Sequence, residues 1–245
     1  MNQFLTETLL TCDQHTIRYD LFLRGHDKVV VIAPGFFNSK QSILLKQLAQ
    51  ELNDVYDVVA MDFRGHGQSG GLFYWTAKEY LDLTAVLEKF RPHYRKIGVI
   101  GFSLGGATSI ITSGRTKLID SLIAVSAPAE FGKIEYRLWE LDFENDIWFN
   151  LFHRKGKGVR PGPFWLKKER PIDAIAGVTA PILFIHGTRD WVINPWHSQA
   201  LYDLTTTHKK IAMIEGGPHA EYLIRKNKNE TLRLIRDWLE QTLVK

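Results

Sequence analysis

The chain has 245 residues, of which 44% are hydrophobic and 24% charged, and its formal net charge is +4. These proportions are ordinary for a globular protein, and a chain of this length fits one α/β domain that needs no disulfide or metal to hold its core. The small positive charge is spread along the chain, which argues against the concentrated basic face of a nucleic-acid-binding protein.

A single cysteine, Cys12, excludes an intrachain disulfide and is typical of a reducing compartment. Because it precedes every catalytic pattern, we interpret it as a packing residue. The first residues lack the basic region and long apolar run of a signal peptide. No apolar stretch reaches the roughly 20 residues that span a membrane. We therefore expect a soluble cytoplasmic protein without a transmembrane segment, whose oligomeric state these features leave open.

Short β-branched runs alternate with segments of helical periodicity over most of the chain. One run, Val29–Ala33, is continuously apolar, which indicates a strand buried on both faces. This alternation predicts right-handed βαβ units and a mostly parallel sheet with helices on both faces. The predicted strands are 16–23 (with a partner at 6–12), 29–33, 58–61, 96–100, 122–125, 181–185 and 211–214, and the predicted helices are 40–52, 77–90, one from about 103, and 230–243.

The interval 130–172 interrupts this alternation, because it contains no clean strand–helix unit. A stretch of this length inside a compact domain is usually functional. We predict that it is a small, partly helical lid over the carboxyl edge of the sheet, inserted in a single domain of residues 1–245. The alternative is a pair of peripheral helices packed as ordinary core. Its aromatic residues are Phe131, Tyr136, Trp139, Phe143, Trp148, Phe149, Phe152, Phe164 and Trp165.

The segment Val99–Gly106 carries the strongest chemical pattern. An apolar strand leads into a Gly-Phe-Ser-Leu-Gly sequence centred on Ser103, and small residues then begin a helix. A serine on such a sharp strand-to-helix turn is held in a strained conformation, with its hydroxyl above the sheet and the amide donors of a helix N-terminus beside it. We predict that Ser103 is a nucleophile; the alternative is a glycine-rich turn with a helix-capping serine.

A serine hydroxyl needs a base to take its proton, and that base is usually a histidine oriented by a carboxylate. Asp190 lies in the loop after the strand 181–185, and His219 follows the last strand in a Gly-Gly-Pro-His sequence. Ligands of parallel sheets bind beyond the carboxyl ends of the strands. We therefore predict that Asp190 and His219 meet Ser103 at that edge.

Two other residues compete for these roles. His186 lies at the end of a strand, where a hydrogen-bonded structural histidine is the better interpretation. Glu215 shares a loop with His219, which makes it a weaker carboxylate candidate than Asp190. The pattern requires no metal and no cofactor.

A tetrahedral intermediate requires backbone N–H donors for its oxyanion. We predict that one donor belongs to Leu104, the residue after Ser103. The other belongs to the loop after Val29–Ala33, where Phe36 is the first candidate and Phe37 its competitor.

The glycine-rich turn 62–71 follows the next strand. Its glycines are free to adopt positive φ, and we expect Asp62 and Arg64 to pair and hold it. We predict that this turn shapes the site without taking part in catalysis, and we assign no catalytic role to His66.

Four motifs together carry a family resemblance: Asp62-x-Arg-Gly-His-Gly-x-Ser69, Gly101-Phe-Ser-Leu-Gly105, His186-Gly-x-x-Asp190, and the late His219. On these motifs the chain resembles the α/β-hydrolase superfamily, and within it small bacterial-type esterases, acylglycerol lipases and cinnamoyl-ester hydrolases. The resemblance covers essentially the whole chain outside 130–172. It implies an α/β-hydrolase fold with a mostly parallel eight-stranded sheet, and a Ser103–Asp190–His219 triad. Many relatives carry His-Gly before the oxyanion residue, where this chain has Pro34-Gly35.

The combined pattern predicts a serine hydrolase that acts on a small-molecule acyl ester. Ser103 attacks the carbonyl while His219, oriented by Asp190, takes its proton. The N–H groups of Phe36 and Leu104 hold the oxyanion, and water then releases the acid. The same constellation serves thioesterases, lysophospholipases, peptidases and acyltransferases, and a ligand-binding protein with little turnover is the non-enzymatic alternative. The aromatic insertion favours an apolar or aromatic substrate group.

Overall fold

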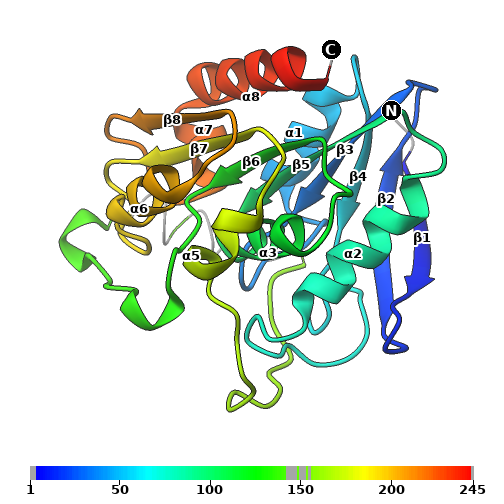
Figure 1. Ribbon diagram of the computed structural model, residues 1–245, viewed down its shortest axis with the longest axis horizontal. Coiled ribbons are helices and arrows are strands. Elements are labelled where there is room, and N and C mark those ends of the chain that lie inside the picture. Colours follow the sequence, from blue (N-terminus) through cyan, green and yellow to red (C-terminus); the bar gives the residue numbers. More distant parts are fainter. Residues whose placement is uncertain (1–3, 142–147, 149–152, 154–155, 244–245) are drawn as a thin grey trace.

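The computed structural model describes residues 4–141, 148, 153 and 156–243, which form a single eight-stranded sheet with helices on both faces (Figure 1). No helix in these ranges is both long and apolar enough to cross a membrane. The strands are β1 (Leu5–Leu10), β2 (Thr16–Phe22), β3 (Lys28–Ala33), β4 (Asp57–Met61), β5 (Lys96–Phe102), β6 (Ser121–Val125), β7 (Ile182–Gly187) and β8 (Lys209–Ile214). The helices are α1 (Ile43–Leu52), α2 (Glu79–Phe90), α3 (Leu104–Arg115), α5 (Pro171–Ala174), α6 (Trp196–Leu204), α7 (Tyr222–Lys226) and α8 (Lys228–Leu243).

The strand order is β1-β2-β4-β3-β5-β6-β7-β8. Strand β2 runs antiparallel to both of its neighbours, whereas every pair from β4 to β8 is parallel. The chain passes from β3 to β4 on one side and then returns to β5 on the other, so the order reverses at β3. Ligands of open parallel sheets bind at such a reversal, beyond the carboxyl ends of the strands. The loops after β3 and β5 are therefore the expected place for a site.

The central strands are covered on both faces, because their side chains alternate between two hydrophobic cores. In β3, Val29, Val31 and Ala33 belong to the core that includes residues of α2, α3 and α6. Val30 and Ile32 belong to the core that includes residues of α1, α7 and α8. Figure 1 shows α8 on one face of the sheet and α2 and α3 on the other. The mostly parallel eight-stranded α/β architecture and the doubly buried strand are confirmed.

The predicted strands and long helices agree with the structure to within a few residues, but three helices were missed. Helix α6 follows Pro195, and α5 and α7 have only four and five residues, too few for an apolar periodicity to reveal them. The interpretation of Cys12 as a packing residue is wrong, because its side chain is exposed in the turn between β1 and β2. Connecting turns run over the surface, where a cysteine need not be packed.

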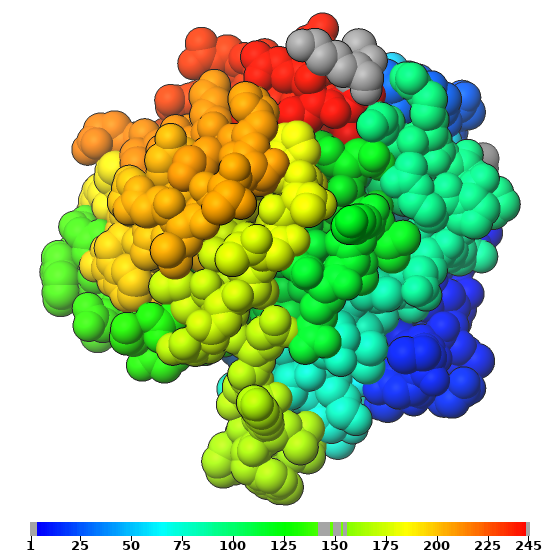
Figure 2. All heavy atoms as spheres, viewed as in Figure 1, coloured from blue at the N-terminus to red at the C-terminus, as the bar shows by residue number. Residues whose placement is uncertain are grey.

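The insertion 130–172 leaves much of its aromatic surface exposed. Trp139, Phe164 and Trp165 are 76%, 66% and 73% exposed, so these side chains are not packed as ordinary core. Figure 2 shows the yellow-green end of the insertion projecting from the body of the molecule. Its described part contains two short 3₁₀ helices, Phe131–Lys133 and Leu138–Glu140. Outside the described residues lie 142–147, 149–152 and 154–155, with Phe143, Phe149 and Phe152.

Arg64 is a fully buried cation that joins the glycine-rich turn to α2. Its Nε and Nη2 lie 2.8 and 2.7 Å from Asp82 Oδ1, and its backbone N–H donates to Asp82 Oδ2 at 2.9 Å. Asp13 accepts from both Nη atoms at 2.8 and 2.9 Å. The expected pairing of Arg64 with Asp62 is therefore wrong. The Asp62 carboxylate instead accepts the backbone N–H groups of Gln68, in the same turn, and of Lys40, in the loop after β3.

Replacing Asp82 by Asn should lower the free energy of unfolding by about 3–5 kcal/mol, because it removes the fully buried counter-charge of a buried guanidinium. Asp13→Asn is the matched control. The Asp13 side chain is 25% exposed, so water compensates for the lost charge and a loss of about 1 kcal/mol is expected. Urea denaturation of both variants measures the difference. Equal losses, or a larger loss for Asp13→Asn, would contradict this assignment.

Candidate active site

Ser103 lies on the turn between β5 and α3, with φ 50° and ψ −112°. This backbone conformation is strained for a residue with a side chain. A Cβ at Gly101 would lie 2.4 Å from Gly105 O, and a Cβ at Gly105 would lie 2.2 Å from Ala33 O, so the turn closes only with glycines at both positions. The Ser103 N–H donates to Val125 O at 2.8 Å, which fixes the turn to β6. The strand, turn and helix around this serine are those that the motif predicts.

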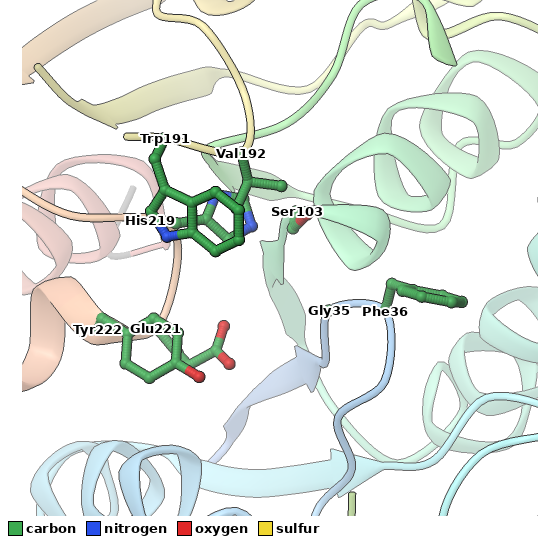
Figure 3. Close-up of a pocket in the computed structure, with 8 residues that line it drawn as sticks. All are labelled: Gly35, Phe36, Ser103, Trp191, Val192, His219, Glu221 and Tyr222. Carbon is green, nitrogen blue, oxygen red and sulfur yellow. The ribbon is translucent and has the colours of Figure 1, made fainter. Parts of the chain in front are cut away.

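Asp190 and His219 lie on the loops after β7 and β8 and contact each other. His219 Nδ1 lies 2.7 Å from Asp190 Oδ2 and 2.9 Å from Oδ1. A carboxylate accepts the proton of this hydrogen bond, so Nε2 is the basic nitrogen of the neutral ring. His219 and Ser103 line the same pocket (Figure 3). The fold thus brings the three predicted residues together from three separate loops.

Several donors hold the Asp190 carboxylate in place. Its Oδ1 accepts the N–H groups of Val192 and Ile193 at 3.0 and 2.8 Å, and His186 Nε2 lies 3.3 Å from Oδ2. Burial alone would raise the pKa of Asp190, but attraction to His219 and hydrogen bonds from His186 and His219 outweigh it and hold this pKa well below its ordinary value. The carboxylate is therefore ionised and oriented at neutral pH.

The two competing residues take other positions. His186 is fully buried, with Nδ1 2.6 Å from Ser198 Oγ and Nε2 2.9 Å from Ile193 O. Because a carbonyl only accepts, Nε2 carries the proton and Nδ1 accepts from the serine hydroxyl. This arrangement agrees with the structural role expected for His186. Glu215 is exposed on its loop, whereas Asp190 contacts His219 directly.

The loop that carries His219 is held by contacts that the sequence did not reveal. The Ala220 N–H donates to Ser126 Oγ at 3.0 Å, which ties this loop to the end of β6. A Cβ at Gly187 would lie 2.2 Å from Gly217 O, so the loops after β7 and β8 pack backbone against backbone. The position of His219 therefore depends on two small residues and one serine hydroxyl.

The two predicted oxyanion donors flank Ser103, since Phe36 and Leu104 line a cavity together with it. Leu104 opens α3, and the first N–H groups of a helix have no acceptor within the helix. Within the described part of the chain, neither the Phe36 nor the Leu104 N–H has a hydrogen-bond acceptor, so both can serve a ligand. Phe37 is 51% exposed with φ 64°, and it does not line this cavity.

Buried polar residues anchor the loop after β3. Asn38 Nδ2 donates to Glu221 Oε1, and Asn38 Oδ1 accepts the Ser39 N–H at 2.9 Å. Lys40 Nζ lies 2.6 Å from Asp20 Oδ1, and both of these side chains are 1% exposed. A buried ion pair of this kind holds one geometry, because either charge alone would be destabilising. The loop with Phe36 is therefore fixed at its far end.

Two cavities meet at Ser103. The smaller, of about 190 Å³, is called the histidine pocket here, and His219, Glu221, Tyr222 and Trp191 line it (Figure 3). The larger, of about 270 Å³, is called the aromatic pocket, and its apolar wall comes from Phe73, Trp75, Phe131, Ile134 and Tyr136. Phe36, Ser103 and Val192 line both cavities. The site therefore offers two spaces beside one serine, one that includes the side chains of His219 and Glu221 and one walled mainly by aromatic and aliphatic side chains.

His66 belongs to an aromatic cluster behind this site. Its ring centroid lies 5.0 Å from that of Phe73 and 6.0 Å from that of Phe36. The ring is 1% exposed, and its Nδ1–H donates to Arg64 O at 3.1 Å. His66 thus packs against the wall of the aromatic pocket, in agreement with the structural role expected for it.

Sequence reasoning missed Glu221 and Tyr222, which line the histidine pocket. Glu221 is 7% exposed although it is charged. Its position two residues after His219 was a usable signal, because residues next to the predicted base stay close to the site. Glu215, which competed with Asp190 in the sequence, lies four residues before His219 and is exposed.

The chain belongs to the alpha/beta hydrolase family, whose model matches residues 30–243. It is 27% identical over 211 residues to the uncharacterized protein YqkD of Bacillus subtilis (strain 168), covering 80% of this chain and 66% of that protein, just under two thirds of its length. It is 21% identical over 240 residues to the serine hydrolase BPHL of Homo sapiens, covering 87% of this chain and 80% of that protein.

Solved structures share the fold. The esterase Pf2001 of Pyrococcus furiosus superposes with a TM-score of 0.79 at 22% identity, covering 98% of this chain and 93% of that one. Identity at this level establishes the common architecture alone. The protein is thus an alpha/beta hydrolase related to a serine hydrolase and similar in fold to esterases.

Replacing His66 by Gln should flatten the pH dependence of stability. Burial lowers the pKa of His66 to about 4, and its hydrogen bond to Arg64 O offsets only part of that effect. An unfolded histidine titrates at about 6.5, so as the pH falls from about 6.5 to 4 the unfolded chain gains a proton that the folded chain does not. The free energy of unfolding should fall by roughly 3 kcal/mol over this window because of His66.

Urea denaturation at several pH values between 7.5 and 4 measures this effect in wild type and in His66→Gln. The free energy of unfolding of wild type should fall by roughly 3 kcal/mol more than that of His66→Gln over this range, whatever the difference in stability at pH 7.5. Curves that stay parallel over the whole range would show that His66 does not titrate as described.

Proposed function

We propose that the protein is a carboxylic-ester hydrolase that works through an acyl-enzyme on Ser103, with a small-molecule acyl ester as substrate. One observation supports this proposal above others. A serine with a strained backbone and a histidine held by a buried, ionised carboxylate line the same pocket. Family membership and the relationship to a serine hydrolase agree with it.

In the proposed reaction, Ser103 Oγ attacks the acyl carbonyl and His219 Nε2 takes the serine proton. Asp190 holds the ring through Nδ1, and its charge stabilises the imidazolium that forms. The N–H groups of Phe36 and Leu104 donate to the oxyanion. His219 then gives its proton to the leaving oxygen, and a water molecule, activated by the same ring, releases the acid.

The insertion 130–172 acts as a lid in this proposal. Phe131, Ile134 and Tyr136 come from it and form part of the wall of the aromatic pocket. An apolar or aromatic group of the substrate would bury its surface against these side chains. Substrate selection then depends on the insertion, whereas the chemistry depends on the loops of the sheet.

Labelling with a fluorophosphonate probe, which phosphonylates an activated serine, tests the proposal. Wild type should label, Ser103→Ala should not, and hydrolysis of p-nitrophenyl butyrate should fall about a thousandfold or more in that variant. Ser113→Ala is the matched control, since Ser113 is a buried serine of α3 that does not line either cavity; it should label like wild type. Failure of wild type to label contradicts the proposal, and labelling of Ser103→Ala places the nucleophile elsewhere.

A further inference from the structure

The histidine pocket contains a carboxylate that the proposed reaction does not use. Glu221 is 7% exposed, and Figure 3 shows its carboxylate directed into the space between Tyr222 and Gly35. Its Oε1 accepts a hydrogen bond from Asn38 Nδ2. A charge taken out of water is stabilised only when its oxygen atoms are well hydrogen-bonded. The second oxygen, Oε2, is therefore a strong acceptor placed at the edge of a cavity.

This oxygen lies close to the reacting atoms. A Cβ built on Gly35 would lie 3.8 Å from Glu221 Oε2 and 3.5 Å from Ser103 Cβ. The two real atoms are therefore within about 7 Å of each other, on either side of a residue that has no side chain. In the tetrahedral intermediate, where the acyl carbon is bonded both to Ser103 Oγ and to the leaving oxygen, a small alcohol portion would span this distance.

The position of His219 determines which portion of an ester, the alcohol or the acyl group, enters the histidine pocket. The histidine that takes the serine proton later gives it to the leaving oxygen, so that oxygen must lie within hydrogen-bond reach of the ring. His219 lines the histidine pocket and is not part of the lining of the aromatic pocket. The alcohol portion therefore lies on the side of Glu221, and the acyl portion on the side of the aromatic wall.

The charge around Glu221 favours a neutral donor over a cation. Lys157 Nζ donates to the Tyr222 hydroxyl oxygen at 3.2 Å, next to the pocket. Burial lowers the pKa of Lys157, and the attraction of Glu221 opposes that effect, so the two charges act on each other. Because the Lys157 ammonium contacts Tyr222 in the wall of the histidine pocket, a ligand cation would meet a like charge there. A hydroxyl group can donate a hydrogen bond to Oε2 without adding charge.

We infer that the histidine pocket binds the alcohol portion of the ester and that Glu221 accepts a hydrogen bond from a hydroxyl group on it. The substrate class is then monoesters of a diol or polyol that carry an apolar acyl group. This inference rests on the proposed function, since it assigns the two sides of the site around Ser103. It makes Glu221 a specificity-determining residue and also a brace for the loop with Asn38.

Two esters that differ by one group test it: 2-hydroxyethyl butyrate and propyl butyrate, in which a methyl group replaces the hydroxyl. Wild type should show a kcat/KM about tenfold or more higher for the hydroxyethyl ester, because a site built around a buried acceptor discriminates against a ligand without the donor. In Glu221→Leu the ratio of the two kcat/KM values should fall to about one. Rates are normalised to the sites that a fluorophosphonate titrates, so a partly misfolded variant does not alter the ratio.

Phe131→Leu, on the acyl side, is the matched control, and its ratio should equal that of wild type. Glu221→Gln keeps an acceptor for Asn38 but removes the negative charge of residue 221. A third ester, 2-(dimethylamino)ethyl butyrate, carries a cation on its alcohol portion and tests whether that charge selects a cation. A wild-type preference for this cationic ester over the hydroxyethyl ester, lost in Glu221→Gln, overturns the hydroxyl assignment. A ratio near one in wild type, or one unchanged in Glu221→Leu, shows that Glu221 is only a brace. If wild type hydrolyses none of the esters and does not label at Ser103, the proposed function itself fails.

Discussion

Ser103 keeps its strained backbone because two glycines let β5, α3 and the end of β3 approach one another more closely than side chains allow. Gly101 and Gly105 face carbonyl oxygens at distances that exclude a Cβ. The strain persists because the surrounding structure is over-determined. Strand β5 lies between β3 and β6, and its apolar side chains are buried in both cores. Burial of the sheet thus holds a single serine in a conformation that it would not adopt alone.

The parallel strands bring the rest of the site to that serine. Asp190, His219 and Phe36 follow β7, β8 and β3, and all of these strands end at the same edge of the sheet. Each loop is then fixed by its own local contacts, such as the Ser126 hydroxyl beside Ala220. The sheet therefore supplies the coarse placement, and a few backbone and hydroxyl contacts supply the fine placement that chemistry at one atom requires.

The sequence predicted the features that depend on local pattern. The strand Val29–Ala33 was evident from its apolar run, and the turn at Ser103 from its glycines, because periodicity and φ preferences act over short distances. The pairing of Arg64 was misjudged for the opposite reason. Its partner Asp82 comes from a helix packed against the turn, so the contact depends on tertiary packing that no local pattern encodes. Glu221 was missed in the same way, since its burial is visible only once Asn38 lies beside it.

Two cavities meet at Ser103, and each has its own set of lining residues. The aromatic pocket takes its wall from the insertion and from Phe73 and Trp75, whereas the histidine pocket takes its polar groups from the loop after β8. In the proposed reaction these two cavities take the two portions of the ester, and Glu221 is the carboxylate beside the alcohol portion. The residues that distinguish the two cavities lie outside the Gly-Phe-Ser-Leu-Gly motif, so the motif predicts a reaction type and leaves the substrate open.

The most direct measurement is the mass of the enzyme during turnover. Wild type mixed with a slowly hydrolysed aromatic acyl ester and quenched in acid should gain the mass of one acyl group, and peptide mapping should place this group on Ser103. The adduct should disappear as the ester is consumed. Turnover without any adduct, or an adduct on another residue, would contradict an acyl-enzyme on Ser103.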